Sequence, residues 1–418
     1  MCITLPGRVI EVGEGKATID IFGRQQKIKI LDTGITVGDW VLSANDYAVK
    51  KISAAEAKEI AGLFDYYPPS VSDSGSGQLR AILSRSLQHR LNREEIQFLL
   101  RLENPADLSA LYSQANVLRL SQALNHICVH GIIEFSNHCQ NNCGYCGLNR
   151  DNRELKRYRL SDEEIISTAV AASNDRGYKI LVLQSGEDDY YDLGRLKKII
   201  AEIKKQARVF IYLSIGDRPL ADYRELKKIG AGGILMRFET VNPDLHYALR
   251  QKNSTQRIEL IKQLKNLDYI IATGFLIGLP GQTIGDLAND LLTLAELAPF
   301  MPSIGPLVPS KNTPLSEAKP VDKDLVLKII AIVRLLLPAA RIPITTAMET
   351  LYGESFRQEA FLSGANSVML NLTPAQCRED YYIYENKFFD EEKKFEKWAL
   401  FKGDLSYQML EQELKTAI

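Results

Sequence analysis

The sequence is poor in cysteine, nearly neutral in charge and free of long apolar segments. Only 6 of its 418 residues are cysteine, and three of these lie within one short stretch of the chain. Clustering of this kind favours metal binding over a disulfide framework. The formal net charge of -1 gives no electrostatic reason to expect binding to nucleic acid or to an anionic membrane.

Neither a membrane span nor a secretory leader is predicted. Every apolar run falls short of the roughly 20 residues that cross a bilayer. The N-terminus also lacks the basic and then apolar pattern of a signal peptide. We therefore expect a cytoplasmic protein in a reducing compartment, and an anaerobic one if its metal centre is sensitive to oxygen.

The three clustered cysteines form a C-x3-C-x2-C motif of Cys139, Cys143 and Cys146. Three thiolates can bind three irons of a 4Fe–4S cluster, and the fourth iron can then chelate the amino and carboxylate groups of S-adenosylmethionine (SAM). One electron from such a cluster breaks the S–C5′ bond and yields a 5′-deoxyadenosyl radical. Tyr145 is suited to lie against the adenine. The alternative is a structural zinc site, which needs a fourth ligand, and His138 is the residue nearby.

The N-terminal residues 1–67 predict a small, OB-like β-barrel with a C-terminal helix. Glycines separate five short β segments, at 9–12, 17–21, 27–30, 40–42 and 48–52. The helix begins with a capping-box pattern of Ser53 and Glu56. Residues 68–78 are rich in proline, serine and glycine, and predict a flexible linker between two domains.

Residues 79–418 predict an α/β fold, a (β/α)8 barrel of the TIM type preceded by a helical segment over 79–125. Apolar strands alternate with amphipathic helices such as 161–172, 193–206 and 283–294. The eight expected strands are 127–135, 180–184, 209–214, 233–236, 270–277, 303–306, 342–346 and 367–371. Chemistry in such barrels lies at the C-terminal ends of the strands, and the cysteine motif directly follows the first one.

Polar residues also follow the second and fourth predicted strands. Gln184, Ser185 and Glu187 end the second strand, where the carboxylate can accept a hydrogen bond from an ammonium group. Arg237 and Glu239 lie two residues apart at the end of the fourth strand, and so point to the same side of it. They suit the two charged ends of a methionyl group, but an internal ion pair is an equal alternative.

Further candidates lie beyond the fourth strand. Arg257, just inside the next helix, is a candidate for binding a carboxylate. The glycine-containing turn 278–283 has no lysine, so we interpret it as a turn that cradles a cofactor and not as a phosphate loop. Thr345 and Thr346 end the seventh strand, where their hydroxyls can bind a substrate or satisfy backbone groups.

At these motifs the chain resembles the HydE family of radical SAM enzymes, the maturases of FeFe-hydrogenase. The resemblance covers roughly residues 80–380. It is carried by 133–137, 139–148, 157–159, 183–188, 239–243, 278–283, 304–306, 312–315 and 345–348. It implies a full barrel, one catalytic 4Fe–4S cluster and adenosylation in a closed cavity. It also implies that Ser185, Glu239 and Arg257 hold SAM and that Thr345 and Thr346 face the substrate.

The resemblance further implies a substrate and partners. The family's substrate is thought to be a cysteine-bound iron dicarbonyl cyanide complex, Fe(CO)2CN, whose sulfur the adenosyl radical attacks during assembly of the diiron subcluster. We expect a small organometallic or amino-acid-derived substrate, a reduced ferredoxin or flavodoxin-type electron donor and other hydrogenase maturation proteins as partners.

The sequence departs from this family at several positions. His130, an expected substrate-cavity residue, and Gly233 stand where arginines line the family's anion-binding cavity, and Glu349 stands where glycine is usual. Some members bind a second cluster through C-terminal cysteines, but here only Cys377 lies in that region. No second cluster is therefore expected.

The N-terminal domain resembles the HypC-type chaperones of NiFe-hydrogenase maturation, at 1–9, 38–42 and 56–59. In that family the initiator methionine is removed, and the new N-terminal cysteine binds an iron carbonyl cyanide unit through its amine and thiolate. This makes Cys2 a candidate iron ligand. The family's histidine is replaced by Ala44, so a barrel that serves only to dock partners is the alternative.

Three functions stay open on this basis. The first is a hydrogenase-maturation enzyme. The second is an amino-acid mutase of the same fold, similar to methylornithine synthase; biotin synthase is disfavoured because its sacrificial second cluster needs cysteines that this chain lacks. The third is a non-catalytic carrier that holds an iron fragment on Cys2 and uses the large barrel as a scaffold.

Overall fold

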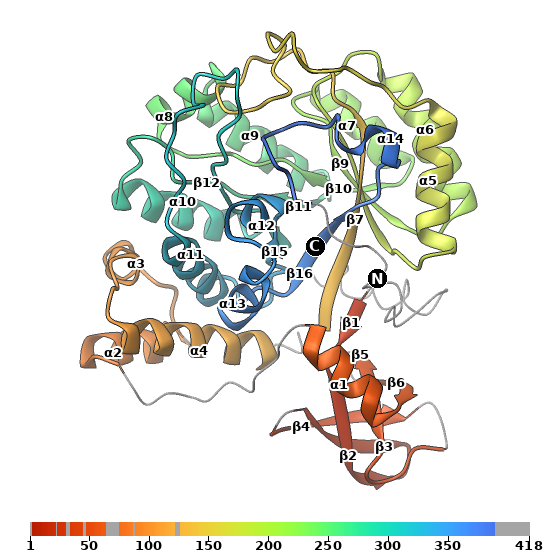
Figure 1. Cartoon of the computed structure of the whole chain (residues 1–418), viewed down its shortest axis with the longest axis vertical. Coiled ribbons are helices and arrows are strands. Elements are labelled where there is room, and N and C mark those ends of the chain that lie inside the picture. Colours follow the sequence, from red (N-terminus) through yellow and green to blue (C-terminus); the bar gives the residue numbers. More distant parts are fainter. Residues whose placement is uncertain are drawn as a thin grey trace.

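The computed structural model describes residues 2–21, 23–30, 34–44, 47–63, 75–86, 88–121 and 126–388. Within them the chain forms a small N-terminal barrel and a large barrel, with three helices beside the large one (Figure 1). Among the described helices, none is both long and apolar enough to cross a membrane. The predicted linker, 68–78, falls mostly outside these residues, and helix α2 (Gly77–Ser86) already begins within it.

The small barrel confirms the expected N-terminal fold. Its strands close in the order β2-β3-β4-β6-β5. They are β2 (Pro6–Gly13), β3 (Lys16–Ile21), β4 (Arg24–Ile30), β5 (Trp40–Ala44) and β6 (Tyr47–Ile52). Helix α1 (Ala54–Leu63) follows. The predicted capping box is present, because the backbone N–H groups of Ser53 and Glu56 each donate to the other's side chain, at 2.8 and 3.1 Å.

The first strand of the chain belongs to the large barrel instead. Strand β1 (Cys2–Thr4) pairs antiparallel with the start of β7 (His126–Ser136), and the register places Cys2 opposite Cys128. Strand β7 extends from the large barrel toward the small one (Figure 1). This pairing therefore joins the two barrels at the N-terminal end of β7, the end remote from the cysteine motif.

The large barrel is a nearly closed parallel sheet in the order β13-β11-β10-β9-β8-β7-β16-β15. Its other strands are β8 (Ile180–Ser185), β9 (Phe210–Ser214), β10 (Ala231–Leu235), β11 (Ile270–Thr273), β13 (Met301–Pro302), β15 (Pro343–Ile344) and β16 (Ser367–Asn371). A separate pair, β12 (Leu276–Ile277) and β14 (Gly305–Pro306), continues β11 and β13. The predicted TIM-type architecture is confirmed.

Helices surround this sheet. They are α5 (Asp162–Asn174), α6 (Leu193–Gln206), α7 (Leu220–Lys228), α8 (Pro243–Arg250), α9 (Ser254–Lys265), α10 (Ile284–Leu297), α11 (Lys323–Leu336), α12 (Thr346–Tyr352), α13 (Phe356–Leu362) and α14 (Ala375–Arg378). Helices α3 (Arg93–Leu100) and α4 (Pro105–Ser121) pack against α10 and α11. Ser161 and Thr283 both form capping boxes, which explains why these helix starts are evident in the sequence.

The fifth strand differs from its prediction. The sequence predicts one strand over 270–277, but the structure divides it into β11 and β12 at Gly274. A Cβ atom on Gly274 would lie 2.2 Å from the backbone oxygen of Ser303. Two backbones therefore come into close contact at this point, and such a contact between segments far apart in sequence leaves no local pattern.

Side chains fill the lower interior of the large barrel, below its mouth. A Cβ atom on Gly233 would lie 2.3 Å from the Tyr212 ring, so the tyrosine occupies the space beside this glycine. His130 is buried, and neither of its ring nitrogens has a hydrogen-bond partner among the described residues. Burial and then the charge of Arg341 lower the pKa of His130 to about 3, which keeps the imidazole neutral.

Replacing Gly233 with alanine tests this packing. Because the new methyl group would overlap the Tyr212 ring, we expect Gly233→Ala to lower the free energy of unfolding by about 1–3 kcal/mol. Thermal and denaturant unfolding measure the change. Gly62→Ala is the matched control, because a Cβ atom there meets nothing within 4 Å, and it should leave stability equal or slightly higher.

Candidate functional site

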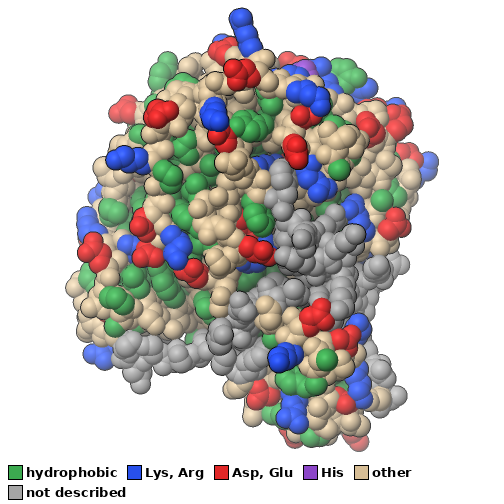
Figure 2. All heavy atoms as spheres, in the orientation of Figure 1, with side chains coloured by type: hydrophobic (Ala, Val, Ile, Leu, Met, Phe, Trp, Pro, Cys, Tyr) green, Lys and Arg blue, Asp and Glu red, His purple; other side chains and the backbone are tan. Residues whose placement is uncertain are grey.

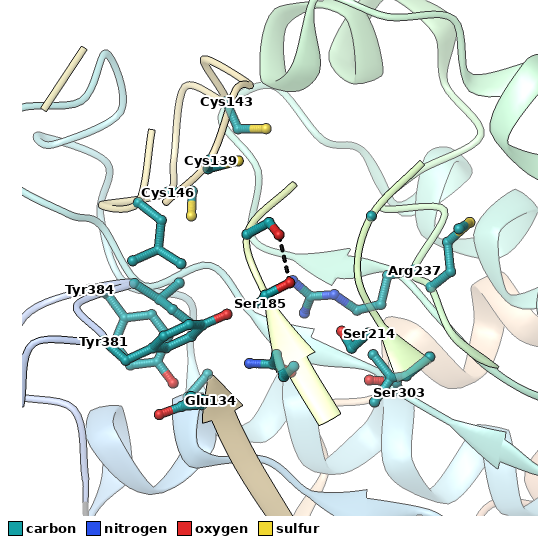
Figure 3. Close-up of a pocket in the computed structure, with 18 of the residues that line it drawn as sticks. Glu134, Cys139, Cys143, Cys146, Ser185, Ser214, Arg237, Ser303, Tyr381 and Tyr384 are labelled. Atoms are coloured by element: carbon teal, nitrogen blue, oxygen red, sulfur yellow. Dashed lines mark hydrogen bonds between the residues drawn. The ribbon is translucent and has the colours of Figure 1, made fainter. Parts of the chain in front are cut away.

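Three thiols meet at the mouth of the large barrel. Cys139, Cys143 and Cys146 lie in the loop that follows β7, and all three line one cavity at the C-terminal ends of the strands (Figure 3). This is the place that the position of the motif after the first barrel strand predicts. The structure thus brings together the three thiol groups that a 4Fe–4S cluster requires.

One arginine gives the cysteine loop its shape. The guanidinium of Arg157 donates to four backbone oxygens, those of Asn137 (2.5 Å), Leu148 (3.0 Å), Asn149 (2.6 Å) and Asn152 (3.3 Å). These carbonyls lie on both sides of the cysteine motif, so one planar group with several donors closes the loop. Burial lowers the pKa of Arg157, yet a guanidinium stays charged in proteins.

Backbone hydrogen bonds attach the same loop to distant segments. Gly144 donates to the oxygen of Leu249 at 2.8 Å and accepts from the N–H of Leu315 at 3.0 Å. Gly147 donates to the oxygen of Ile383 at 2.7 Å. The loop is therefore held through its backbone, which leaves the three thiols free to face the cavity.

Burial opposes the ionisation of two of these thiols. It raises the pKa of Cys143 to about 11 and that of Cys146 well above the usual range, while the nearby Arg250 acts in the opposite direction on both. Metal ligation requires the thiolate form. Binding of a metal centre must therefore release protons here and supply the energy that ionises the thiols.

His138 is poorly placed to complete a zinc site. Cys143 and Cys146 line this cavity, whereas His138 is absent from its lining and lines a second pocket together with Cys139. A tetrahedral zinc ion needs its four ligands around one point. The structure thus disfavours the zinc alternative and leaves the three thiols as one set.

Next to the cysteines, Glu239 has a carboxylate oxygen that accepts no hydrogen bond from the described residues. Glu239 is buried, has a positive φ of 65°, and accepts a hydrogen bond from the Tyr145 hydroxyl at 3.0 Å through Oε1. Arg237 Nε lies 3.3 Å from Oε2, which is an ion-pair distance, but no donor among the described residues makes a hydrogen bond to Oε2. The internal pair that the sequence allowed therefore exists and still leaves an acceptor for a bound ammonium group.

The exit of β8 lies against the cysteine loop. Gln184, Ser185 and Glu187 all line the cavity, as does Gly186 between them. A Cβ atom on Gly186 would lie 2.2 Å from the oxygen of His138, so the two turns are in direct contact. The Glu187 carboxylate already has partners within the protein. It accepts a hydrogen bond from the backbone N–H of Asp217 at 3.0 Å and forms ion pairs with Arg250 and Lys252.

Two arginines approach the cysteine end of the cavity. Arg257 donates to the backbone oxygen of Arg237 at 2.6 Å and forms an ion pair with Asp217. Its guanidinium is therefore already bound to groups of the protein. Arg250, at the end of α8, also lines the cavity, and its buried Nε has no hydrogen-bond partner within the described ranges. Arg250 was not among the predicted site residues, because it ends helix α8 in a stretch of sequence with no motif that indicates a ligand.

Polar groups also lie at the deeper end of the cavity. Glu134, on β7, accepts from Asn371 Nδ2 at 2.6 Å and forms an ion pair with Lys387. Thr346 shares a hydrogen bond of 2.8 Å with the Tyr384 hydroxyl, while the buried Thr345 hydroxyl has no hydrogen-bond partner among the residues that the structure describes. Figure 3 shows Glu134, Tyr381 and Tyr384 together below the cysteines.

The remaining sequence candidates lie elsewhere. His130 is absent from the cavity lining, because the next inward residue of β7, Ile132, already forms that lining. Glu349 is buried and accepts from Arg357 Nε at 2.9 Å. Cys377 lies in α14 with a half-buried thiol. The backbone of Cys2 lies in β1, but its side chain falls outside the described residues.

Comparison with protein families gives three matches. The Radical SAM superfamily matches residues 133–294, and the Biotin and Thiamin Synthesis associated domain matches residues 303–395. The HupF/HypC family matches residues 1–64. The first two cover most of the large barrel, and the third covers the small one.

Individual proteins give a consistent result. The [FeFe] hydrogenase maturase subunit HydE of Thermotoga maritima is 42% identical over 309 residues, which is 74% of this chain and 88% of that protein. The 3-methylornithine synthase of Methanosarcina acetivorans is 31% identical over 292 residues, 69% of this chain and 81% of that protein. A crystal structure of methylornithine synthase superposes with a TM-score of 0.69 at 24% identity, covering 81% of this chain and 100% of that chain. This structural similarity to methylornithine synthase supports the fold of the large barrel.

Arg157→Lys tests how the cysteine loop is held. A single ammonium group cannot reach carbonyls on both sides of the motif, and each hydrogen bond to a charged donor contributes about 1.5–3 kcal/mol. We expect the variant to bind less iron and sulfide per chain after anaerobic reconstitution, measured by chemical analysis and by absorbance. Arg153→Lys, at an exposed position four residues earlier, should bind as much as the unaltered chain.

Proposed function

This chain belongs to the HydE family of radical SAM hydrogenase maturases, and we propose that it acts on a cysteine-bound Fe(CO)2CN unit during assembly of the diiron subcluster of FeFe-hydrogenase. The observation that carries the proposal is one cavity with three thiols at its mouth and a set of polar groups at its deeper end. Such a cavity suits a small substrate held beneath a radical source.

The residues at the mouth fit a 4Fe–4S cluster with SAM. Three thiols line the cavity, and the buried Oε2 atom of Glu239 and Nε atom of Arg250 have no hydrogen-bond partner in the part of the chain that the structure describes. An N–H of an amino group and a carboxylate would supply hydrogen bonds to these two atoms, so the pair matches the two polar groups of a methionyl moiety. When bound, the cluster supplies the electron that breaks the S–C5′ bond of SAM and releases the 5′-deoxyadenosyl radical.

We assign the surrounding residues to SAM as follows. Glu239 would accept a hydrogen bond from an N–H of the amino group, and Arg250 would donate to the carboxylate, with Arg257 and Arg237 supplying further positive charge. The ring of Tyr145 is fixed by its hydroxyl bond to Glu239 and lies beside the adenine. Gln184 and Ser185 line the β8 side of the cavity, where they are available to the ribose hydroxyls. Glu187 acts indirectly, by holding the cations around it.

At the deeper end, we assign substrate binding to Thr345, Thr346 and the groups around Glu134. The Thr345 hydroxyl is buried and makes no hydrogen bond to another described residue, so it can donate to a carboxylate or a cyanide nitrogen. Thr346 acts through Tyr384, whose orientation it fixes. The ammonium of Lys387 and the carboxylate of Glu134 offer one charge of each sign to a cysteine-derived substrate.

The N-terminal domain extends this proposal. Its match to the HupF/HypC family supports Cys2 as a ligand for an iron fragment, next to an enzyme that uses such a unit. We propose one 4Fe–4S cluster and no second one, because Cys377 is the only cysteine of the chain after the cysteine motif. Other maturation proteins would supply the substrate and receive the product.

A mutase similar to methylornithine synthase is the second candidate function. The paired charges of Glu134 and Lys387, together with the amide of Asn371, would also suit an amino-acid substrate. The relative from Methanosarcina acetivorans, at 31% identity, gives this alternative independent support.

Anaerobic turnover separates these functions. Cluster-loaded protein would be mixed with SAM, dithionite and a cysteine-ligated iron dicarbonyl cyanide complex, and followed by electron paramagnetic resonance and by chromatography. We expect 5′-deoxyadenosine-derived product to form together with a new low-valent iron species that carries the adenosyl group. Formation of 5′-deoxyadenosine without such an iron species would contradict the proposed substrate and favour the mutase.

The same assay distinguishes an enzyme from a carrier. Cys139→Ser should abolish all cleavage of SAM, because it removes a cluster ligand. Cys2→Ser should leave cleavage unchanged and lower only the binding of an iron fragment to the small barrel. A chain that loses its iron-handling function with Cys2→Ser and keeps it with Cys139→Ser would be a carrier.

Glu239→Gln tests the assignment of the ammonium site. Because a hydrogen bond to a charged group contributes about 1.5–3 kcal/mol, we expect SAM to bind roughly 10- to 100-fold more weakly, with little change in iron content. Equilibrium binding to the cluster-loaded protein measures this. Glu225→Gln, an exchange of the same kind on the outer helix α7, should bind SAM normally. Unchanged affinity in Glu239→Gln would place the ammonium elsewhere.

A further inference from the structure

The pairing of β1 with β7 brings two cysteine positions together at the junction of the two barrels. The register sets residue 2 directly opposite Cys128. Residues paired in this way in antiparallel strands share a face of the sheet, with Cα atoms about 4.5–5.5 Å apart. Strand β7 continues from this junction into the large barrel (Figure 1). The junction therefore holds a pair of cysteines that is separate from the cysteine motif at the other end of β7.

The face of β7 that carries Cys128 is the one that lines the interior of the large barrel. Side chains alternate along a strand, so Cys128, His130 and Ile132 share one face. Ile132 lines the cavity beneath the cysteine motif. Cys128 and His130 are each only 1% exposed. The thiol and the imidazole therefore lie inside the barrel, on the way from the junction to that cavity.

His130 is a buried imidazole that makes no hydrogen bond within the described residues. Neither Nδ1 nor Nε2 has a partner there. Burial keeps the pKa of the ring low, so the ring is neutral. A neutral imidazole has one nitrogen lone pair to offer and is the commonest ligand of transition metals. Because a buried polar ring without hydrogen bonds is costly, a bound ion at this nitrogen would stabilise it.

The thiol of Cys128 lies against a buried guanidinium. Arg341 Nη1 donates to Cys128 Sγ at 2.6 Å. A neighbouring cation favours the thiolate, which is the form that ligates metals. The spacing of the thiol and the imidazole also suits one ion, because residues two apart on a strand are roughly 6.6 Å apart along it. An ion between them can bond to a thiolate at about 2.3 Å and to an imidazole at about 2.0–2.1 Å.

Two buried hydroxyls lie in the same region. Ser367 is the neighbour of Cys128 in the parallel pairing of β16 with β7, and its Oγ has no hydrogen-bond partner in the described part of the chain. The same is true of the Tyr212 hydroxyl. Burial raises the pKa of Tyr212, and the charges of Arg341 and Cys128 also act on it, so these groups lie near one another. Both hydroxyls can donate to the nitrogen of a cyanide ligand on a metal.

The small barrel lacks the donors to complete a metal site by itself. Within residues 1–67 the only cysteine is Cys2, and no histidine occurs there. One thiolate and one α-amine leave a tetrahedral ion with half of its positions open. Histidines do not gather on the face shown in Figure 2 either, and the whole chain has only 5. Strand β7, directly opposite residue 2, supplies both a thiol and an imidazole.

We propose that Cys128 and His130 form a metal site together with residue 2, so that the large barrel supplies two ligands to the iron fragment carried by Cys2. The inference deepens the proposed role of the N-terminal domain and rests on it. Cys2 contributes its thiolate and, once Met1 is removed, its α-amine. A ferrous ion with two thiolates and one cyanide carries a single negative charge, which the charge of Arg341 balances. Each thiol releases a proton as it binds the ion.

The test uses Co²⁺ as the probe, because it accepts the same thiolate and imidazole ligands as Fe²⁺. It is added anaerobically to the cluster-loaded full chain, after mass spectrometry has confirmed the loss of Met1. We expect a single Co²⁺ ion per chain, with sulfur and imidazole neighbours in the X-ray absorption spectrum at the cobalt edge. Cys128→Ser and His130→Gln should each weaken binding by about 10-fold or more. His130→Gln should also remove the imidazole signal.

Controls separate loss of the site from loss of the fold. Cys377→Ser, a change of the same kind in α14, should bind Co²⁺ as the unaltered chain does. The unfolding midpoint and the iron and sulfide content of each variant show whether its barrel has folded. The serine of Cys128→Ser keeps an oxygen that can accept from Arg341, and His130→Gln keeps a polar side chain.

The results that would overturn the inference are distinct from a failure of the enzymatic function. Unchanged affinity for Co²⁺ in folded Cys128→Ser and His130→Gln would mean that β7 supplies no ligand, and loss of binding in Cys2→Ser alone would then leave only the carrier role of Cys2. Unchanged binding in Cys2→Ser would remove both that role and this inference. SAM cleavage driven by dithionite in the unaltered chain tests the enzyme separately.

Discussion

The bonds from the Arg157 guanidinium to the carbonyls around the cysteine motif are the interaction on which the site depends. A loop with three cysteines has many conformations in the unfolded chain, and a metal centre can bind tightly only if few of them remain. One rigid cation that bonds to carbonyls on both sides of the motif removes much of that freedom. Backbone bonds from Gly144 and Gly147 to distant segments then fix the loop relative to the barrel.

Charge is arranged around this loop so that few buried groups stay unpaired. Glu187 and Asp217 bind the nearby cations, and Asp188 binds Arg159, so the β8 turn is held by internal ion pairs. Some buried polar atoms, however, make no hydrogen bond within the described residues. Glu239 Oε2, Arg250 Nε and Thr345 Oγ1 are buried, have no hydrogen-bond partner among the described residues, and belong to residues that line the same cavity. Buried polar atoms without hydrogen bonds are costly, so the three that border this cavity would be stabilised by a polar ligand there.

The two ends of the large barrel have different roles. At the C-terminal ends of the strands, polar groups line an accessible cavity. At the other end, Tyr212 fills the space beside Gly233, His130 is buried and neutral, and strand β1 pairs with β7. Position 2 therefore lies opposite Cys128, eight residues along β7 from the strand end that precedes the cysteines. At about 3.3 Å per residue this separation is roughly 26 Å, so an iron fragment on Cys2 would have to move a long way to reach the mouth.

The sequence alone determined the features that depend on local spacing. The C-x3-C-x2-C motif, the alternation of strands and helices, and the capping boxes at Ser161 and Thr283 each involve residues within a few positions of one another. Only the tertiary structure decided which polar groups share the cavity. Lys387 meets Glu134 across 253 residues, Arg250 reaches the cysteine loop from the end of a helix, and Gly274 divides a strand because Ser303 lies against it. Such contacts arise from the closure of the barrel, and no pattern within a short window of sequence records them.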